Sequence, residues 1–326
     1  MARSQAPAAD GTETQAFDDS TDRDDEMGAA IAKWTEELIE GVQEAEASAE
    51  FQEWLDVQSA FHDYSFRNTL LIKMQRPDAT RVAGFWSWKN NFDRSVKKGE
   101  DAIWIWGPIT AAKCPECGNA PGYHDYIDCT NDEDGTPEEW SEGVVGFQPV
   151  SVFDVSQTEG EPLPELDTSA AAGNLEDPAA FRQAVMAAGE SLAVAHVETV
   201  PADEWTHKGT GVAKYDSEAA TVQAKGGRPS ADVAKTLIHE YAHAELHDPT
   251  MNDDERHKRE VEAEAVAYTV GRHFGLDMSG SELYVASWSE DSGGEIRDRL
   301  DRISRTAETI IEAVDAAHDD AATEGA

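Results

Sequence analysis

Three histidines spaced four residues apart form the pattern with the clearest chemical meaning in this chain. His239, His243 and His247 lie in TLIHEYAHAELHD, and Glu240 follows the first of them. Residues four apart share one face of a helix, so His239 and His243 can bind one zinc ion at about 2.0–2.1 Å. A glutamate beside that pair can take a proton from zinc-bound water. This H-E-x-x-H pattern of zinc hydrolases predicts Glu240 as the catalytic residue, and the apolar flanking turns argue against a chance match.

The last histidine of the row is not expected to bind the same ion. His247 lies about 12 Å from His239 along a helix that rises 1.5 Å per residue, too far for one zinc. Zinc proteases that take a third histidine from the same segment bend at a glycine before it, but the chain has Leu246 and Pro249 at those positions. We interpret His247 as a cation at the helix C-terminus.

The third metal ligand is expected from the segment KREVEAEAVAY. Glu260 and Glu264 share a helical face with small alanines, whereas Glu262 points away from it. We predict Glu260 as the ligand and Glu264 as a carboxylate that orients a ligand histidine through its other ring nitrogen. The roles of these two glutamates could be exchanged, or all three glutamates could be solvated.

Two histidines and one carboxylate leave the fourth position of a zinc ion open for water, as in catalytic zinc sites. The expected reaction is peptide hydrolysis, in which the metal polarises the carbonyl and Glu240 activates the water and protonates the leaving amine. Tyr284 is either a residue that stabilises the oxyanion or part of the core.

Helices and short strands must position these residues. The segment 158–178 is rich in Pro, Gly, Ser and Asp and is a linker candidate. After it, the hydrophobic pattern predicts helices over 177–194, 231–247, 255–275 and 295–314, and strands over 196–200, 211–216 and 220–225. A small sheet covered by helices is expected in a C-terminal domain over 179–316.

The segment from Arg67 to Lys98 concentrates positive charge, with eight basic residues against two acidic ones. Phenylalanine and tryptophan residues lie between the cations, which is the combination that binds single-stranded nucleic acid through phosphates and stacked bases. Alternatively, the aromatic residues form a core and the cations pair with acidic groups. The predicted DNA-binding residues are Arg67, Lys73, Arg81, Trp86, Trp88, Lys89, Arg94, Lys97 and Lys98.

All three cysteines lie in one short stretch, 114–129. Cys114 and Cys117 form a C-x-x-C turn typical of a zinc knuckle, and His124 and Cys129 would complete a tetrahedral structural site. The alternative is that these residues are ordinary buried or loop thiols.

The upstream part of the chain predicts helices over 29–43, 50–61 and 65–75, followed by strands over 80–86, 101–109 and 143–155. We therefore expect an α+β fold with two domains. The expected segments, in chain order, are a disordered acidic tail over 1–26, a nucleic-acid-binding domain over 27–157 with the zinc-knuckle insert, the linker over 158–178, the C-terminal domain over 179–316 and a second disordered tail over 317–326.

The composition is strongly acidic, with 66 acidic and 26 basic residues and a formal charge of -40. Concentrated salt would screen this self-repulsion, so the charge indicates adaptation to a halophilic cytoplasm. A disordered protein is excluded because 40% of the residues are hydrophobic. A secretory signal and a run of apolar residues long enough to cross a membrane are both lacking, so we expect a cytoplasmic protein without membrane contact.

The chain resembles the ArdC family of antirestriction proteins in two parts. The first runs through FHDYSFRNTLLIKMQRPDATRVAGFWSWKNNFDRSVKKGEDAIWIWGPI and VFDVSQTEG, the second through TLIHEYAHAELH and REVEAEAVAY. The resemblance implies an N-terminal domain that binds single-stranded DNA and a C-terminal zincin-like zinc metallopeptidase domain similar to the ImmA/IrrE group, with Glu260 as the third ligand of a gluzincin-like site. The cysteine insert, the acidic surface and the tails depart from the family.

Three functions are compatible with these features. The expected one is an ArdC-like antirestriction protein that protects single-stranded DNA of mobile elements and carries a zinc-dependent metallopeptidase domain acting on a protein substrate. The second is a regulatory protease that cleaves a DNA-bound repressor. The third is a zinc-stabilised DNA-binding module without hydrolysis. The sequence leaves the peptide substrate, the DNA sequence preference and the oligomeric state open.

Overall fold

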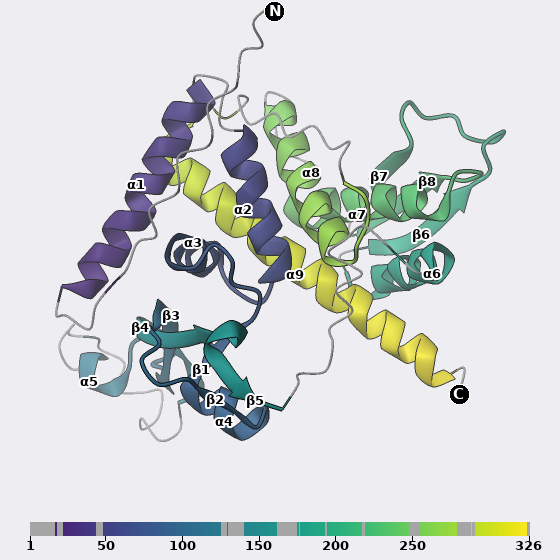
Figure 1. The fold of residues 1–326 in the computed structure, drawn as a ribbon. Coiled ribbons are helices and arrows are strands. Elements are labelled where there is room, and N and C mark those ends of the chain that lie inside the picture. The colour runs from purple at the N-terminus through teal and green to yellow at the C-terminus, as the bar shows by residue number, and fades with distance from the viewer. Residues whose placement is uncertain are drawn as a thin grey trace, which may run out of the picture. The chain divides into compact units, whose positions relative to one another are not determined.

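The computed structural model describes residues 17, 22–43, 48–124, 129, 140–161, 175, 177–192, 194–216, 219–247, 255–278, 288 and 291–324. The chain divides into two compact units (Figure 1). The first consists of Met1–Ala29 with Leu71–Glu161, and the second of Ala30–Leu70 with Pro162–Ala326. Both units contain helices and strands, so the expected mixed α+β class is confirmed.

The first unit is built on the antiparallel strands of its central sheet, which has the order β1-β4-β3. Its elements are β1 (Val82–Gly84), α4 (Phe85–Asn91), β2 (Arg94–Val96), β3 (Ile103–Ala112), α5 (Pro121–His124), β4 (Glu142–Asp154), the short 3-10 helix η2 (Val155–Gln157) and β5 (Thr158–Gly160). Ile103 and Ile105 are buried while the intervening Trp104 is only partly covered, as the two-residue period of a strand requires. A second, two-stranded sheet pairs β2 with β5.

A carboxylate closes the end of β4. Asp154 is 1% exposed, and its Oδ2 accepts the backbone N–H groups of Thr80 and Arg81 at 2.9 and 3.1 Å. The other oxygen accepts the Ser156 amide and caps η2. Burial alone would raise the pKa of Asp154, but these hydrogen bonds outweigh burial and lower it. The charged side chain therefore ties the segment before β1 to the end of β4.

The second unit has a three-stranded sheet with helices packed against it. Its elements are α1 (Arg23–Gln43), which starts in the first unit, α2 (Ser48–Ala60), α3 (Phe66–Gln75), which ends in the first unit, α6 (Pro178–Ala188), the short 3-10 helix η4 (Gly189–Ser191), β6 (Val194–Val200), β7 (Gly211–Asp216), β8 (Ala219–Lys225), α7 (Ser230–Leu246), α8 (Arg256–His273) and α9 (Gly293–Glu324). The central strand β8 pairs in parallel with β6 and antiparallel with β7. Ala220, Val222 and Ala224 of β8 are fully buried.

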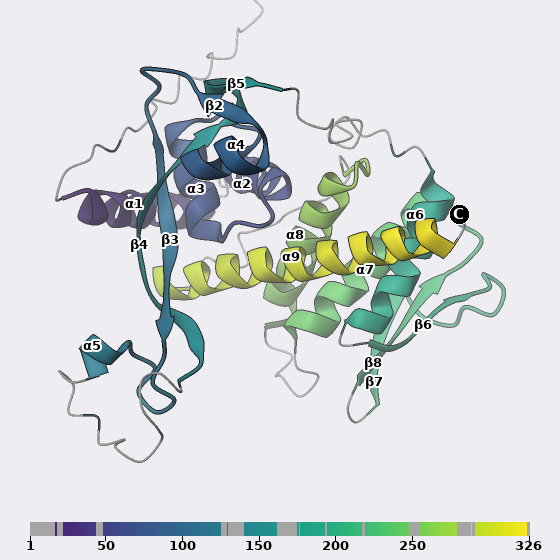
Figure 2. The same cartoon turned by 90° about the horizontal axis from the view of Figure 1, so that it is seen from below.

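The helices α7, α8 and α9 form the core around the histidine row. α8 contacts α7, α9 and α2, and it is buried on nearly every side from Val261 to Gly271. α9 buries Ile296, Leu300 and Ile303 at helical spacing. Figure 2 shows α9, in yellow, running along α8, α7 and α6, and contacts with all three support this view. The histidine helix α7 is therefore packed against the sheet and against α6, α8 and α9.

The compact units differ from the predicted domain boundaries. Helix α2 packs on α8, where the Arg272 guanidinium lies 3.0 Å from Asp56, so residues 30–70 group with the second unit. Helix α9 continues to Glu324 through the predicted tail, because the alanines there favour helix. Helix α1 begins at Arg23, inside the other predicted tail, and the first residues of the predicted linker form β5. Among the described helices, none is both long and apolar enough to span a membrane.

Candidate functional site

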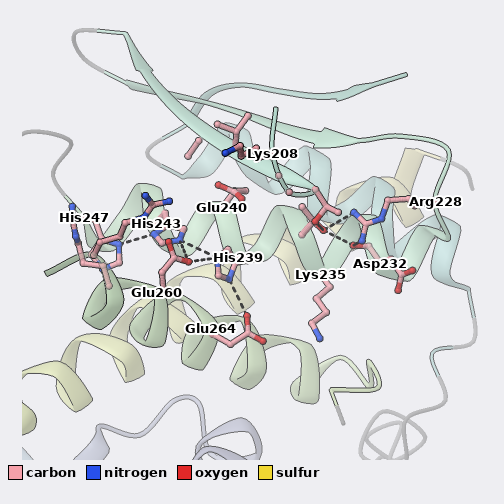
Figure 3. Close-up of a pocket in the computed structure, with 18 residues that line it drawn as sticks. Lys208, Arg228, Asp232, Lys235, His239, Glu240, His243, His247, Glu260 and Glu264 are labelled. Atoms are coloured by element: carbon pink, nitrogen blue, oxygen red, sulfur yellow. Dashed lines mark hydrogen bonds and ion pairs between the residues drawn. The ribbon is translucent and has the colours of Figure 1, made fainter. Parts of the chain in front are cut away.

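Three predicted ligands meet between α7 and α8 in the second unit (Figure 3). The Nε2 atoms of His239 and His243 lie 3.1 Å apart. Glu260 Oε2 lies 3.6 Å from His239 Nε2 and 3.5 Å from His243 Nε2. The histidines come from one face of α7, and Glu260 comes from the first turns of α8.

The spacing of these three atoms fits a tetrahedral metal ion. Bonds of about 2.0–2.1 Å at tetrahedral angles place donor atoms about 3.4 Å from one another. The observed separations of 3.1, 3.5 and 3.6 Å lie around that value. Two imidazoles and one carboxylate are also a common donor set for zinc at catalytic sites. The residues present therefore fit a divalent metal with one position left for water.

His239 is held directly by a second carboxylate. Its Nδ1 lies 3.2 Å from Glu264 Oε2, one helical turn beyond Glu260, which is the arrangement predicted for Glu264. Burial lowers the pKa of His239, but the contacts with Glu260 and Glu264 outweigh burial and raise the pKa to about 9. Both histidines keep the pKa of Glu260 far below its usual range. A metal ion at Nε2 would therefore replace a proton on His239.

His243 is held by a longer chain of hydrogen bonds, which sequence reasoning missed. Its Nδ1 lies 3.0 Å from Nδ1 of His247, and His247 Nε2 lies 3.0 Å from Glu262 Oε2. His247 is 7% exposed, and burial lowers its pKa more than the Glu262 contact raises it. The interpretation of His247 as a cation at the helix end is therefore wrong, since burial favours its neutral form.

Glu262 is the anchor of this chain and is fully buried. Its Oε1 accepts hydrogen bonds from Arg299, at 3.0 Å, and from Arg302, both on α9. Arg299 also donates to Asp291 at 2.7 Å, and Lys258 pairs with the same aspartate. The prediction that Glu262 points away from the ligand face is correct, but the side chain enters a buried ion-pair network on the other side of α8.

Glu240 lies on the side of α7 that faces away from Glu260 and Glu264 and toward β7 (Figure 3). Burial raises the pKa of its carboxyl, and the two histidines and the Ala213 amide offset this only in part. Gly211 at the start of β7 makes room for it, because a Cβ there would lie 2.4 Å from Glu240 Oε1. The catalytic candidate is thus held between the ligand helix and a strand edge that has no side chain at the contact point.

The ligands open into a cleft of about 900 Å³. Its walls are α7, the first turns of α8, and β7 with the segment before it. The cleft is lined by five cationic side chains, Lys208, Arg228, Lys235, Arg256 and Arg259, and by four acidic ones, Asp232, Glu240, Glu260 and Glu264. The charged side chains of the lining therefore nearly balance, whereas the chain as a whole is strongly acidic.

Part of the basic, aromatic segment is exposed in the first unit. Trp86 of α4 is 65% exposed, and the Lys89 ammonium lies 5.4 Å from the centre of its ring. Phe85 and Phe92 are also exposed. Lys73 and Arg81 are partly covered, and Lys98 is exposed. These residues could present both a stacking surface and positive charge.

Four of the predicted DNA-binding residues have other contacts or lie in the other unit. Trp88 is 2% exposed and donates its Nε1–H to Phe153 O at 2.8 Å, so it belongs to the core and cannot stack on a base. The Arg94 guanidinium binds Thr158 and nearby backbone carbonyls and holds β5 to β2. Arg67 lies in the second unit, and Lys97 donates to Ser156 O at 2.8 Å. The amino-acid composition of α4 does not distinguish Trp86 from Trp88. The two residues differ in burial, because Trp86 is exposed and Trp88 is buried.

The structure also brings the three cysteines together, with their Sγ atoms within 4.8 Å of one another. His124 ends α5, but its side chain is outside the described residues. Tyr284 lies outside them as well.

Comparison with known proteins identifies relatives of part of the chain. Residues 22–153 match the N-terminal domain of anti-restriction factor ArdC. An uncharacterized protein of Bacillus anthracis, pXO2-81, is 26% identical over 287 residues, which are 81% of this chain and 47% of that protein, so the chain spans about half the length of this relative. Metal-free and Mn(II)-bound crystal structures of the antirestriction ArdC protein from the R388 plasmid align with a TM-score of 0.41 and 16% identity, over 78% of this chain and 85% of that chain. The chain is therefore similar, over residues 22–153, to the N-terminal domain of anti-restriction factor ArdC.

Proposed function

We propose that the chain is an ArdC-like antirestriction protein in which the second unit is a zinc-dependent metallopeptidase and the first unit binds single-stranded DNA. The observation that carries the peptidase is the convergence of three donor atoms at tetrahedral spacing with a half-buried glutamate beside them. The match of residues 22–153 to the ArdC N-terminal domain supports the antirestriction role.

A divalent metal held by His239, His243 and Glu260 would polarise a scissile carbonyl and lower the pKa of a water molecule. Glu240 is placed to accept a proton from water in the cleft and to deliver it to the leaving amine. Gly211 and the Ala213 amide keep the carboxylate on the cleft side of α7.

Zinc binding and peptide hydrolysis test this proposal in sequence. Wild-type protein should bind zinc, His239→Ala should lose this site, and Glu240→Gln should keep it because Glu240 is not a ligand. Zinc-loaded wild type should cleave members of a mixed peptide library, scored by mass spectrometry, and Glu240→Gln should not. Equal cleavage by both proteins, or none by the wild type, would refute the peptidase.

The DNA-binding part rests on the exposed ring of Trp86 with the cation of Lys89 above it. Stacking is weakened less by salt than phosphate contacts are, so binding should persist in molar KCl. Gel shifts with labelled single-stranded DNA should show binding by the wild type and by Trp86→Phe, and weaker binding by Trp86→Ala. Absence of binding at every salt concentration would exclude this function.

The same variants separate the alternatives. A regulatory protease that acts on a DNA-bound repressor would lose its cellular effect in Glu240→Gln but tolerate Trp86→Ala partly. A DNA-binding module without hydrolysis would keep its antirestriction effect in Glu240→Gln. Protection of incoming DNA from restriction in cells expressing each variant distinguishes these cases.

A further inference from the structure

The three cysteines gather at the far end of the β3–β4 hairpin, away from the proposed peptidase residues in the sequence. Figure 2 shows the long hairpin with α5 beyond its end. The hairpin is still paired at its last residues, where the Lys113 amide donates to Ser141 O at 3.0 Å. Cys114 and Cys117 follow β3 directly, and Cys129 comes from beyond α5. Thiols from two separate stretches thus meet at one point.

The turn around the first two cysteines is shaped to hold two sulfur atoms on one side. The Gly118 amide donates to Cys114 O and the Cys114 amide donates to Asn119 O, each at 2.9 Å. Gly118 has a φ of +72°, which favours glycine at that position. The Asn119 backbone donates to the Cys117 thiol and lowers its pKa. Such N–H groups stabilise negative charge on sulfur ligands.

We propose that Cys114, Cys117 and Cys129 bind one structural zinc ion. Zinc–sulfur bonds of about 2.3 Å place tetrahedral sulfur ligands about 3.8 Å apart, so sulfur atoms already within 4.8 Å need only a small contraction. A disulfide would use two of the three thiols and would not explain the third. Cys114 is 1% exposed, and among the described residues of this tip only Trp140 is a comparably buried large side chain. The ion would therefore replace a hydrophobic core at the end of the hairpin.

Metal analysis in a background without the histidine site tests this proposal independently of the peptidase. The full-length His239→Ala/His243→Ala protein should retain one zinc per chain after dialysis. Adding Cys117→Ser should remove it, whereas adding Ser141→Ala should not. Cobalt in place of zinc should give a thiolate-to-metal charge-transfer band that Cys129→Ser weakens, which provides a second readout if one variant folds poorly.

A background protein that holds no zinc and no cobalt charge-transfer band would overturn the site. Quantitative alkylation showing one free thiol and one disulfide in freshly prepared protein would overturn it too. Both outcomes leave the histidine site untouched, so they do not bear on the peptidase.

A second inference rests on the proposed metal site and concerns the hydrogen-bond chain behind His243. A metal ion at His243 Nε2 leaves Nδ1 with the proton, so Nδ1 donates to His247 Nδ1. His247 then carries its own proton on Nε2 and donates it to the Glu262 carboxylate, which only accepts. The distances of 3.0 Å at both steps allow one assignment of the protons along the chain.

We infer that His247 is a positioning residue that fixes the ring orientation and tautomer of His243. His239 reaches a carboxylate directly at 3.2 Å, whereas His243 reaches Glu262 through one inserted imidazole. Both ligand histidines are thereby braced by glutamates of α8, His239 by Glu264 and His243, through His247, by Glu262. Because His247 is the C-cap residue of α7, directly after the last helical residue Leu246, its position depends on where that helix ends.

Zinc affinity and unfolding temperature, measured on the same variants, test the positioning role. His247→Phe keeps a ring but no hydrogen bonds and should weaken zinc binding about 10–100-fold. His247→Gln offers an acceptor and a donor and should recover part of that loss. If His247→Phe binds zinc as tightly as the wild type, or lowers only the unfolding temperature in chelator, the inference is wrong. Zinc binding unaffected by His243→Ala would instead show that the proposed metal site is wrong.

Discussion

Replacing Glu262 by glutamine should destabilise the second unit strongly, even without metal. The carboxylate is fully buried and accepts hydrogen bonds from Arg299, Arg302 and His247. Removing one partner of a buried ion pair costs about 3–5 kcal/mol because the remaining charge is left uncompensated. The Arg302 side chain is 38% exposed and can rehydrate, and Arg299 keeps Asp291 at 2.7 Å, so the cost should lie near the lower end, about 3 kcal/mol.

The expected change in unfolding temperature follows from the size of the unit. About 3 kcal/mol in a folding unit of roughly 200 residues corresponds to a decrease of about 6–12 °C. Thermal unfolding followed by circular dichroism, in chelator and in molar KCl, measures it, and salt should change the difference little because the network is buried. Glu312→Gln, an exposed glutamate of α9, is the matched control and should change stability by less than about 0.5 kcal/mol. Equal unfolding temperatures for the two variants would refute the reasoning.

The pH dependence gives a second check on the same variant. Burial would raise the pKa of Glu262, but the His247 hydrogen bond and the charges of Arg302 and Arg299 outweigh burial and lower it. A carboxyl with a lowered folded pKa stabilises the fold fully above its unfolded pKa and loses this effect as the pH falls through the folded pKa. The difference between wild type and Glu262→Gln should therefore be complete near neutral pH and shrink below the unfolded value of 4.5. A difference that grows on acidification would contradict the assignment.

Three other predictions follow from single contacts. Gly211→Ala should displace the Glu240 carboxylate and abolish peptide cleavage. Zinc affinity, measured by titration, should stay within about twofold of wild type because Glu240 is not a ligand. A fully active variant would show that β7 does not position the base. Trp86→Ala should weaken single-stranded DNA binding by about 1–3 kcal/mol in gel shifts without lowering the unfolding temperature. Trp88→Ala should instead lower the free energy of unfolding by about 3–5 kcal/mol. The reverse pattern would show that Trp88, and not Trp86, contacts the DNA. The unfolding temperature of the wild type should rise with KCl up to molar concentrations because salt screens a formal charge of -40; a salt-independent unfolding temperature would argue against a halophilic surface.

Helical periodicity was sufficient for the ligand side of α8. A four-residue spacing puts Glu260 and Glu264 on one face whatever else the fold contains, and small alanines on that face allow α7 to approach. The structure places Glu260 beside both histidines and Glu264 beside His239. The same reasoning could not place Trp88, because burial on α4 depends on β4, a strand that begins some 50 residues downstream.

The environment of Glu262, on the opposite side of α8, could not be predicted without knowing which helix packs there. Glu262 looks like a solvated residue in an acidic chain, and only the packing of α9 shows otherwise. The available signal was the spacing of Arg299 and Arg302, which are three residues apart and therefore share a face of an amphipathic helix. In a chain with few cations, two arginines next to the buried stripe of α9 indicate a buried acid on the neighbouring helix.

His247 shows how a correct distance argument can support a wrong interpretation. Eight residues from His239, it cannot share a metal ion with that residue, and this holds in the structure. The same spacing leaves it four residues from His243, so its ring lies against the nitrogen of His243 that faces away from the metal position. The spacing that excludes His247 as a ligand therefore makes it the neighbour of a ligand. An H-E-x-x-H helix that has a further histidine four residues on, and a buried acid on the next helix, should be examined for the same arrangement.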